Sequence, residues 1–234
     1  ETLPRVRHLL LDKTGTLTRG VPQILDIVSY NERHFPGRKI LRLAAAAEAR
    51  LKHPVAEAIL LKAKTEKIRV PDRTGADFQI GLGVEAQVNG YSIHIGNERF
   101  FRQKKIAFEK SSKLVATLNS QGSSTLLFAA DGVLAGLIPY ADQVRPESRD
   151  VVRTLYNRGV KHTVMLTGDN GVIASAVAAR LGIEQYFSGA LPADKAEIVQ
   201  DFQSRGRVVA MVGDGINDSP ALAFADIGIA MKEG

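Results

Sequence analysis

Residues 6–18 read VRHLLLDKTGTLT and join an apolar run to a polar turn. The run 6–11 predicts a strand that is buried on both faces of a parallel sheet. Asp12 ends this strand and is followed by hydroxyls, a glycine and a lysine. Asp, Thr and Gly are ordinary turn residues, so the string is also compatible with a plain polar turn. A carboxylate placed at the end of a buried strand can, however, act as a nucleophile toward phosphorus.

The composition is that of a soluble globular chain. Its 234 residues are 44% hydrophobic and 24% charged, which is enough for one large core or two modest ones. No window approaches the roughly 18 consecutive apolar residues of a membrane-spanning helix, and the N-terminus lacks a signal-peptide pattern. The chain begins at Glu1 and ends just after an apolar run, so we expect it to be a piece of a longer protein.

Charge and cysteine content exclude several kinds of site. The absence of cysteine excludes disulfides and thiolate metal ligands within these residues. A net charge of +6 raises the question of nucleic-acid binding. Lysine and arginine are scattered, aromatic residues make up only 6%, and no nucleic-acid motif is present. We therefore expect no nucleic-acid partner, since affinity for a polyanion such as ATP accounts for the positive net charge equally well.

Helices and strands alternate strictly after Pro146. This pattern predicts a parallel, doubly wound sheet with right-handed crossovers. The expected helices are 146–158, 171–181 and 193–204, and the expected strands are 161–166, 186–188 and 207–212. The opening strand 6–11 has no helix of its own and is predicted to join this later sheet. Residues 1–22 and 139–234 then form one α/β domain, and residues 23–138 form an insertion within it.

The insertion has a different pattern. Residues 23–30 alternate as a strand would, and two antiparallel helices are expected from Pro36-Gly37 to about 51 and from Pro54 to about 67. Asn89-Gly90 predicts a hairpin between 84–88 and 91–95, and Asp131-Gly132 predicts a second between 124–129 and 133–138. Helical patterns recur at 98–104 and 108–120. The insertion is thus predicted to be an α+β domain with an antiparallel sheet.

Four motifs fall at or beside the carboxyl ends of the predicted parallel strands, where such sheets bind ligands. They are Asp12 to Thr16, Thr167-Gly168-Asp169, the helix carrying Lys195, and Gly213 to Asp218. Converging carboxylates of Asp12, Asp214 and Asp218 would repel one another, which implies a bound divalent cation with the preferences of Mg²⁺. Lys195 and the Thr167 hydroxyl could stabilise the charge of a transferred phosphoryl group.

The order of these motifs resembles that of the haloacid-dehalogenase-like phosphotransferases. Asp12 to Thr18, Thr167 to Asp169 and Gly213 to Leu222 look, more specifically, like the phosphorylation-domain motifs of P-type ATPases. The resemblance implies that ATP phosphorylates Asp12, that Asp12, Asp214 and the backbone carbonyl of Thr14 hold Mg²⁺, and that Asn217 and Asp218 complete the phosphate and metal shell. Thr16 stands where related phosphatases carry an acid/base Asp, so the acyl phosphate is expected to persist.

The insertion resembles the nucleotide-binding domain of heavy-metal-transporting P-type ATPases, on the strength of His53-Pro54, Gly81-Leu82-Gly83 and Gly96-Asn97. By this resemblance His53 would orient the adenine and Glu48 would contact its amino edge. Gly81, Gly83, Gly96 and Asn97 would form the pocket wall and floor, and Gly168 and Asp169 would also contact the nucleotide. The family commonly has Ser-Glu before His-Pro, whereas this chain has Leu51-Lys52.

The resemblance implies the ATP-binding, autophosphorylating cytoplasmic unit of an integral membrane pump for a heavy-metal cation. Its partners would be ATP, Mg²⁺ and membrane helices that this chain lacks, with the metal cargo bound elsewhere. The main alternative is a soluble, Mg²⁺-dependent phosphatase of the haloacid-dehalogenase class with an inserted cap domain. A non-enzymatic nucleotide-binding or nucleic-acid-binding module is a third reading, in which Asp12 would be dispensable.

Overall fold

The computed structural model describes residues 5–215 and 217–231 and divides the chain into two compact units. Unit 1 comprises Glu1–Val21, Ser120–Gly122 and Asp142–Gly234. Unit 2 comprises Pro22–Asn119 and Ser123–Ala141. None of the helices in the described ranges is long and apolar enough to cross a membrane.

Unit 1 is built on a parallel sheet of five strands in the order β10-β9-β1-β11-β12. The strands are β1 (His8–Asp12), β9 (His162–Leu166), β10 (Gln185–Phe187), β11 (Val209–Gly213) and β12 (Ile227–Ala230). The opening strand pairs with β9 on one side and with β11 on the other. This confirms that the first strand belongs to the same sheet as the later strands. The chain between β1 and β9 is therefore an insertion.

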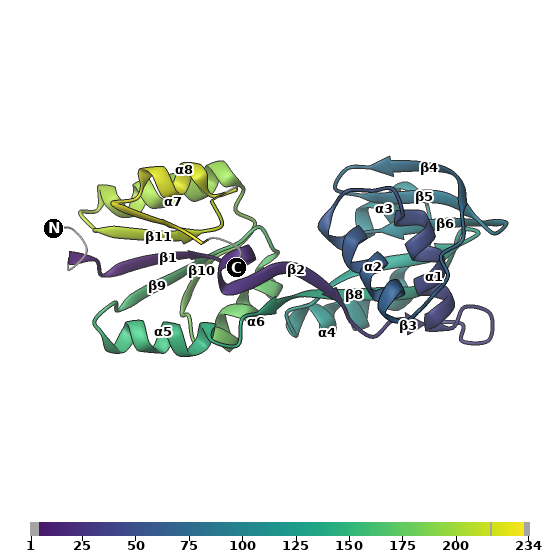
Figure 1. Ribbon diagram of the computed structural model, residues 1–234, viewed down its shortest axis with the longest axis horizontal. Helices are drawn as coiled ribbons and strands as arrows, with labels where there is room; N and C mark the ends of the chain where they lie inside the picture. The colour runs from purple at the N-terminus through teal and green to yellow at the C-terminus, as the bar shows by residue number, and fades with distance from the viewer. Residues whose placement is uncertain (1–4, 216, 232–234) are drawn as a thin grey trace. The chain divides into compact units, whose positions relative to one another are not determined.

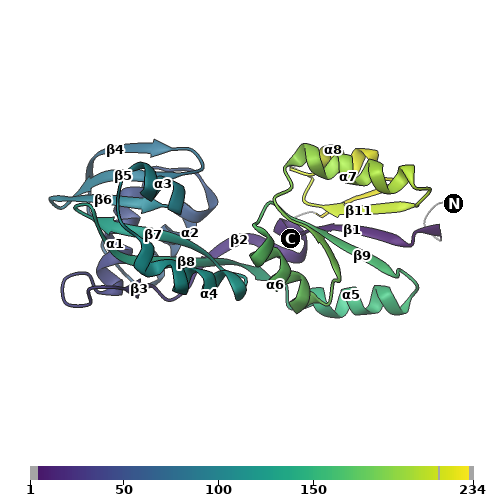
Figure 2. The same ribbon diagram turned by 180° about the vertical axis from the view of Figure 1, so that it is seen from behind.

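Helices cover both faces of this sheet, as Figures 1 and 2 show from opposite sides. They are α5 (Ser148–Asn157), α6 (Gly171–Leu181), α7 (Pro192–Ser204) and α8 (Ser219–Phe224). Alternate residues of β1 point to opposite faces, so Leu9 and Leu11 pack with α5 and α6, whereas Leu10 packs with α7 and α8. A strand buried on both sides explains the continuous apolar run.

Most of the second sheet belongs to unit 2, and its strand order is β2-β8-β7-β6-β5-β4, with β3 also paired to β8. The strands are β2 (Thr18–Ile24), β3 (Val28–Ser29), β4 (Arg73–Gln79), β5 (Gly83–Val88), β6 (Tyr91–Gly96), β7 (Ser124–Ala130) and β8 (Val133–Val144). The helices are α1 (Gly37–Glu48), α2 (Pro54–Thr65), α3 (Glu98–Gln103) and α4 (Ser112–Ser120), the last preceded by a short 3₁₀ turn at Glu109–Ser111. The predicted α+β character is confirmed.

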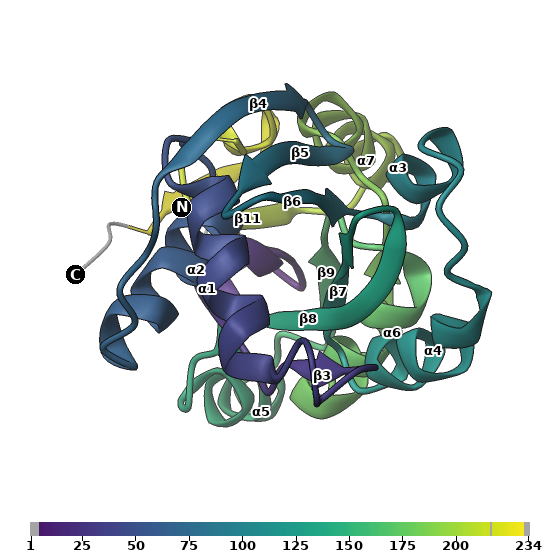
Figure 3. The same cartoon turned by 90° about the vertical axis from the view of Figure 1, so that its right-hand side faces the viewer.

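The sheet of unit 2 curls around α1 and α2, which Figure 3 shows from the end. Alanines 44–47 of α1 are fully buried and let the helices and sheet approach closely. A second core on the other face joins Phe100 and Phe101 of α3 to Leu127 and Leu137 of the sheet.

Several expected elements differ from the structure. Residues 23–30 are not one strand, because β2 ends at Ile24 and β3 contains only Val28–Ser29. Strand β4 was missed because five of its seven residues are exposed, so it lacks an alternating apolar pattern. Helix α8 and strand β12 were also missed, and both are short. The helix expected over 108–120 begins only at Ser112.

Candidate functional site

The parallel strands bring the predicted catalytic residues to one edge of the sheet in unit 1. Asp12 is the last residue of β1, Thr167 follows β9, and Asp214 follows β11. Because these strands are parallel neighbours, their carboxyl ends lie at the same edge. Asp12 and Thr167 are each only 2% exposed, and Asp218 is fully buried. Ile216, within the last motif, lies outside the described residues.

Lys195 joins two of these carboxylates. Its Nζ lies 2.6 Å from Asp12 Oδ1 and 2.6 Å from Asp218 Oδ1, and all three side chains are buried. Lys195 sits in the first turn of α7, where the Asp194 carboxylate accepts a hydrogen bond from the backbone N–H of Leu191 at 2.8 Å. Helix capping therefore fixes the turn that presents the ammonium group to Asp12.

Burial dominates the ionisation of Asp12. Burial raises its pKa from the ordinary 3.8 to about 6, while Lys195 opposes this rise and Asp218 and Asp214 add to it. Burial also lowers the pKa of Lys195, but Asp12 and Asp218 outweigh it and leave that pKa above its ordinary value. Two carboxylates share one ammonium group. Lys195 therefore stays charged, but it offsets only part of the cost of burying the Asp12 charge.

The same edge offers a donor set of the kind Mg²⁺ takes. Asp214 lies against the Gly15 turn, since a Cβ added to Gly15 would be 3.8 Å from Asp214 Oδ2. Asn217 donates to Asp214 from its backbone N–H at 3.1 Å and from its side-chain amide at 3.4 Å. Mg²⁺ usually takes only one or two carboxylates and keeps several waters. The carboxylates of Asp12 and Asp214 fit that requirement.

Three converging carboxylates do not by themselves require a cation here. Lys195 already supplies a positive charge to Asp12 and Asp218, and Asp218 Oδ2 also accepts from the backbone N–H of Asp214 at 3.3 Å. Over residues 5–215 and 217–231, no group of three or more His, Asp or Glu side chains is arranged to hold a metal ion. Mg²⁺ binding by Asp12, Asp214, Asp218 and the Thr14 backbone carbonyl therefore stays a prediction.

The loop after Asp12 is held by side chains that follow the insertion. Arg145 Nε donates to the backbone oxygens of Thr16 and Thr18 at 3.1 and 3.2 Å, and its Nη2 donates to that of Gly15 at 3.2 Å. Ser148 Oγ donates to Leu17 O at 2.9 Å. The sequence predicted no role for these two side chains, because about 130 residues separate them from the loop they hold.

Lys13, next to Asp12, has a different environment from Lys195. Its Nζ lies 2.8 Å from Asp142 and 2.7 Å from Asp169, and the side chain is 7% exposed. Burial lowers the pKa of Lys13, but these two carboxylates outweigh it and raise that pKa above the ordinary value. Asp169, predicted to contact nucleotide, is thus paired with Lys13. Asp142 Oδ2 also accepts a bond from Thr14 Oγ1 at 3.4 Å.

Two threonines at this edge differ in their bonding. Thr167 Oγ1 accepts from the backbone N–H of Asp169 at 3.1 Å, which closes the turn containing Gly168. The Thr16 hydroxyl is buried and has no hydrogen-bond partner in the part of the chain that the structure describes. A hydroxyl cannot act as the carboxylic acid/base expected at this position in related phosphatases.

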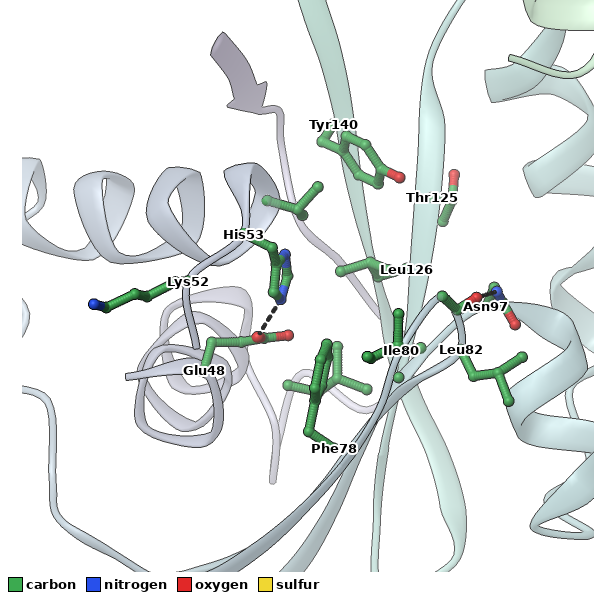
Figure 4. A pocket seen from close by; sticks show the side chains of 15 residues that line it. Glu48, Lys52, His53, Phe78, Ile80, Leu82, Asn97, Thr125, Leu126 and Tyr140 are labelled. Atoms are coloured by element: carbon green, nitrogen blue, oxygen red, sulfur yellow. Dashed lines mark hydrogen bonds and ion pairs between the residues drawn. The ribbon is translucent and has the colours of Figure 1, made fainter. Parts of the chain in front are cut away.

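Unit 2 contains a separate cavity of about 520 Å³, shown in Figure 4, which is within the usual size range of small-molecule pockets. The six residues predicted to bind nucleotide in the insertion all line it: Glu48, His53, Gly81, Gly83, Gly96 and Asn97. Lys52 also contributes to the lining. The sequence did not predict its apolar and aromatic walls, which include Phe78, Ile80, Leu126 and Tyr140.

His53 is fixed at the start of α2. Its Nδ1 accepts from the backbone N–H of Ala56 at 3.3 Å and caps the helix, and its Nε2 lies 3.0 Å from Glu48 Oε2. The first bond requires an unprotonated Nδ1, so Nε2 carries the hydrogen and donates to Glu48. Burial raises the pKa of Glu48, which His53 and Arg73 partly oppose. The Glu48 carboxylate predicted to meet the adenine amino group is thus already hydrogen-bonded to His53.

Asn97 also has an internal role. Its Nδ2 donates to Gly81 O at 2.8 Å, and its Oδ1 accepts from the backbone N–H of Phe100 at 3.0 Å and so caps α3. Gly81 has a positive φ of 72° in the turn between β4 and β5. Asn97 therefore holds this turn against the start of α3, at the wall of the cavity.

Gly83 and Gly96 face each other on β5 and β6. A Cβ on Gly83 would come within 2.3 Å of Ile95 O, and one on Gly96 within 2.7 Å of the Phe100 ring. The two glycines are therefore needed for strand and helix packing, whether or not a base approaches them.

We expect Gly83→Ala to destabilise unit 2 by about 1–3 kcal/mol, because the added methyl overpacks a closed contact. Chemical denaturation of the variant and the parent measures this difference. Gly37→Ala is the matched control in the same unit, since its Cβ would meet nothing closer than 3.5 Å. Equal stability of the Gly83 variant and the parent would contradict the packing role.

Comparisons with known proteins agree with this geometry. Residues 6–226 match the family model of the haloacid dehalogenase-like hydrolases, and the chain belongs to this family. The chain is 41% identical over 99% of its length to a zinc-exporting P-type ATPase of Mycobacterium marinum, and 42% identical, also over 99%, to a manganese-exporting P-type ATPase of Mycobacterium leprae. It spans only 32% of the length of each.

A solved structure of a P-type ATPase also matches the whole chain. The crystal structure of a zinc-transporting PIB-type ATPase in the E2.Pi state matches this chain with a TM-score of 0.80 and 36% identity. The match covers 100% of this chain and 37% of that one. Both units therefore have counterparts within a heavy-metal P-type ATPase.

Proposed function

We propose that this chain is the ATP-binding and phosphorylated part of a P-type ATPase that moves a heavy-metal cation across a membrane. The observation that carries the proposal is the buried Asp12–Lys195–Asp218 cluster at the carboxyl edge of the parallel sheet. A separate cavity in the inserted unit, lined by Glu48 and His53, supplies a place for the nucleotide. Relatives exporting zinc and manganese support the heavy-metal class and leave the cargo open.

In the proposed reaction, the Asp12 carboxylate attacks the γ-phosphate of ATP and ADP leaves, forming an acyl phosphate. Lys195 and Thr167 stabilise charge on the transferred group. Mg²⁺ held by Asp12, Asp214 and the Thr14 carbonyl, with Asn217 and Asp218 completing the shell, would neutralise phosphate charge. In this proposal the membrane helices and the metal cargo site belong to the rest of a longer protein, and this chain is its part on the cytoplasmic side.

The test is incubation of the chain with γ-labelled ATP and Mg²⁺, and separately with small phosphate esters. We expect label that is stable in acid and released by hydroxylamine, as for an acyl phosphate, with little ester hydrolysis. Brisk turnover of esters without ATP affinity would contradict the pump assignment and favour a soluble phosphatase with a cap domain.

A further inference from the structure

The nucleotide cavity of unit 2 contains a pair of nearly parallel rings. Phe78 of β4 lies over His53, with 5.6 Å between ring centroids and 11° between ring planes. Figure 4 shows both rings at the same side of the cavity, with Glu48 bonded to the edge of the imidazole. The Phe78 side chain was not among the residues predicted to bind nucleotide.

The internal bonds of His53 limit how it can contact a ligand. Both ring nitrogens are engaged within the protein, one with Ala56 and one with Glu48. A hydrogen bond from the imidazole to a base would break either the cap of α2 or the contact with a buried carboxylate. The contact that His53 can offer without such a loss is the face of its ring, and Phe78 covers one face.

Phe78 is held by fewer contacts than a residue of a central strand would be. It lies on β4, which is the edge strand of its sheet, and the residue is 39% exposed. A register irregularity between Thr74 and Ala76 interrupts the pairing of this strand with β5. Edge strands are held on one side only, so moving Phe78 disrupts less packing than moving the capped His53.

We propose that the purine base of the nucleotide binds between His53 and Phe78, a role that rests on the proposed ATP binding by this cavity. A flat base between two parallel rings needs about 7 Å, since each stacked contact takes about 3.5 Å. The rings, whose centroids are 5.6 Å apart, therefore move farther apart when the base enters, with β4 moving outward. Phe78 then covers the base and favours purines, whose larger ring system makes more stacking contact.

Removal of the Phe78 ring tests this role. Base stacking on an aromatic residue contributes about 1–3 kcal/mol, so Phe78→Ala should weaken ATP and AMP binding about 5- to 150-fold by calorimetry. Binding of inorganic tripolyphosphate, which has no base, should be unchanged. Phe224→Ala is the matched control, since Phe224 is a 52% exposed phenylalanine of unit 1 that does not line the cavity.

A second variant reports on the base directly. The chain contains no tryptophan, so Phe78→Trp introduces a single tryptophan, excited selectively at 295 nm, at the proposed stacking position. Its emission should be quenched by ATP and AMP and unaffected by tripolyphosphate. Phe78→Leu keeps an apolar side chain without the aromatic face, and should retain the fold while losing affinity.

The outcomes separate this inference from the function on which it rests. If the parent chain binds ATP and Phe78→Ala binds it equally well, the stacking role is wrong and the nucleotide pocket stands. If the parent chain binds neither ATP nor AMP, the nucleotide assignment fails and the stacking role fails with it. Quenching of the tryptophan variant, together with a selective loss of base-containing ligands in Phe78→Ala, supports the proposal.

Discussion

Asp12→Asn should abolish acid-stable, hydroxylamine-sensitive labelling by ATP. Asparagine matches the size of Asp12 but lacks the carboxylate that attacks the phosphate, so the acyl phosphate cannot form. Labelling with γ-labelled ATP should drop at least a thousandfold, while nucleotide affinity measured by calorimetry stays within about twofold, because the cavity lies in the other unit. Full labelling of this variant would contradict the assignment of Asp12 as the phosphorylated residue.

The same variant should be more stable than the parent at neutral pH. The folded-state pKa of Asp12 is about 6 and its ordinary value is 3.8, so the folded state holds this proton more tightly. The stability gained from this tighter proton binding is fully present below pH 3.8 and is lost as the pH rises through 6. The pKa difference corresponds to about 3 kcal/mol of ionisation cost in the folded state above pH 6.

Asparagine avoids this cost because it stays neutral at every pH. In metal-free buffer, Asp12→Asn should therefore raise the free energy of unfolding of unit 1 by up to about 3 kcal/mol at pH 7.5 and by almost nothing at pH 4. Urea denaturation at both pH values measures the difference. Asp150→Asn is the exposed control: it removes only a surface pair with Arg153 on α5 and should change the free energy of unfolding by less than about 1 kcal/mol at either pH. A gain that is equal at both pH values would exclude ionisation of Asp12 as its cause.

Lys195→Met should cost both stability and phosphoryl transfer. It leaves Asp12 and Asp218 buried without their shared ammonium partner, and breaking a buried ion pair on one side typically costs about 3–5 kcal/mol. The loss should be largest at pH 8, where Asp12 is ionised, and smaller at pH 5, where protonation of Asp12, whose pKa burial raises to about 6, relieves the repulsion. Labelling should fall about 10²- to 10³-fold through loss of a charge facing the transferred phosphoryl group.

Lys113→Met on α4 is the control, because Lys113 is exposed and makes no ion pair within the described residues. Lys195→Arg retains the charge and keeps the experiment informative if the methionine variant does not fold. The arginine variant should be more stable than the methionine variant at pH 8. Equal stability of Lys195→Met and the parent at pH 8 would contradict a structural role for the buried ammonium group.

Much of the architecture followed from local patterns. The continuous apolar run 6–11 predicted a doubly covered strand, and Asn89-Gly90 predicted the β5–β6 hairpin; both were confirmed. Strand β4 was not predicted, because an exposed edge strand leaves no alternating apolar pattern. Strand β4 carries Phe78, so the same lack of pattern concealed one wall of the cavity in unit 2.

Local sequence was enough to predict which chemical groups stand at the ends of the parallel strands, because each strand end and its motif are adjacent in the chain. Which of these groups pair depends on the folded chain. Lys195 and Asp12 are 183 residues apart, and no spacing rule links them. The charge states of these groups also depend on the fold, because desolvation and Coulomb interactions vary with burial and distance. Burial of Asp12, together with the nearby charges of Lys195, Asp214 and Asp218, gives it a pKa of about 6, which residues 6–18 alone could not predict.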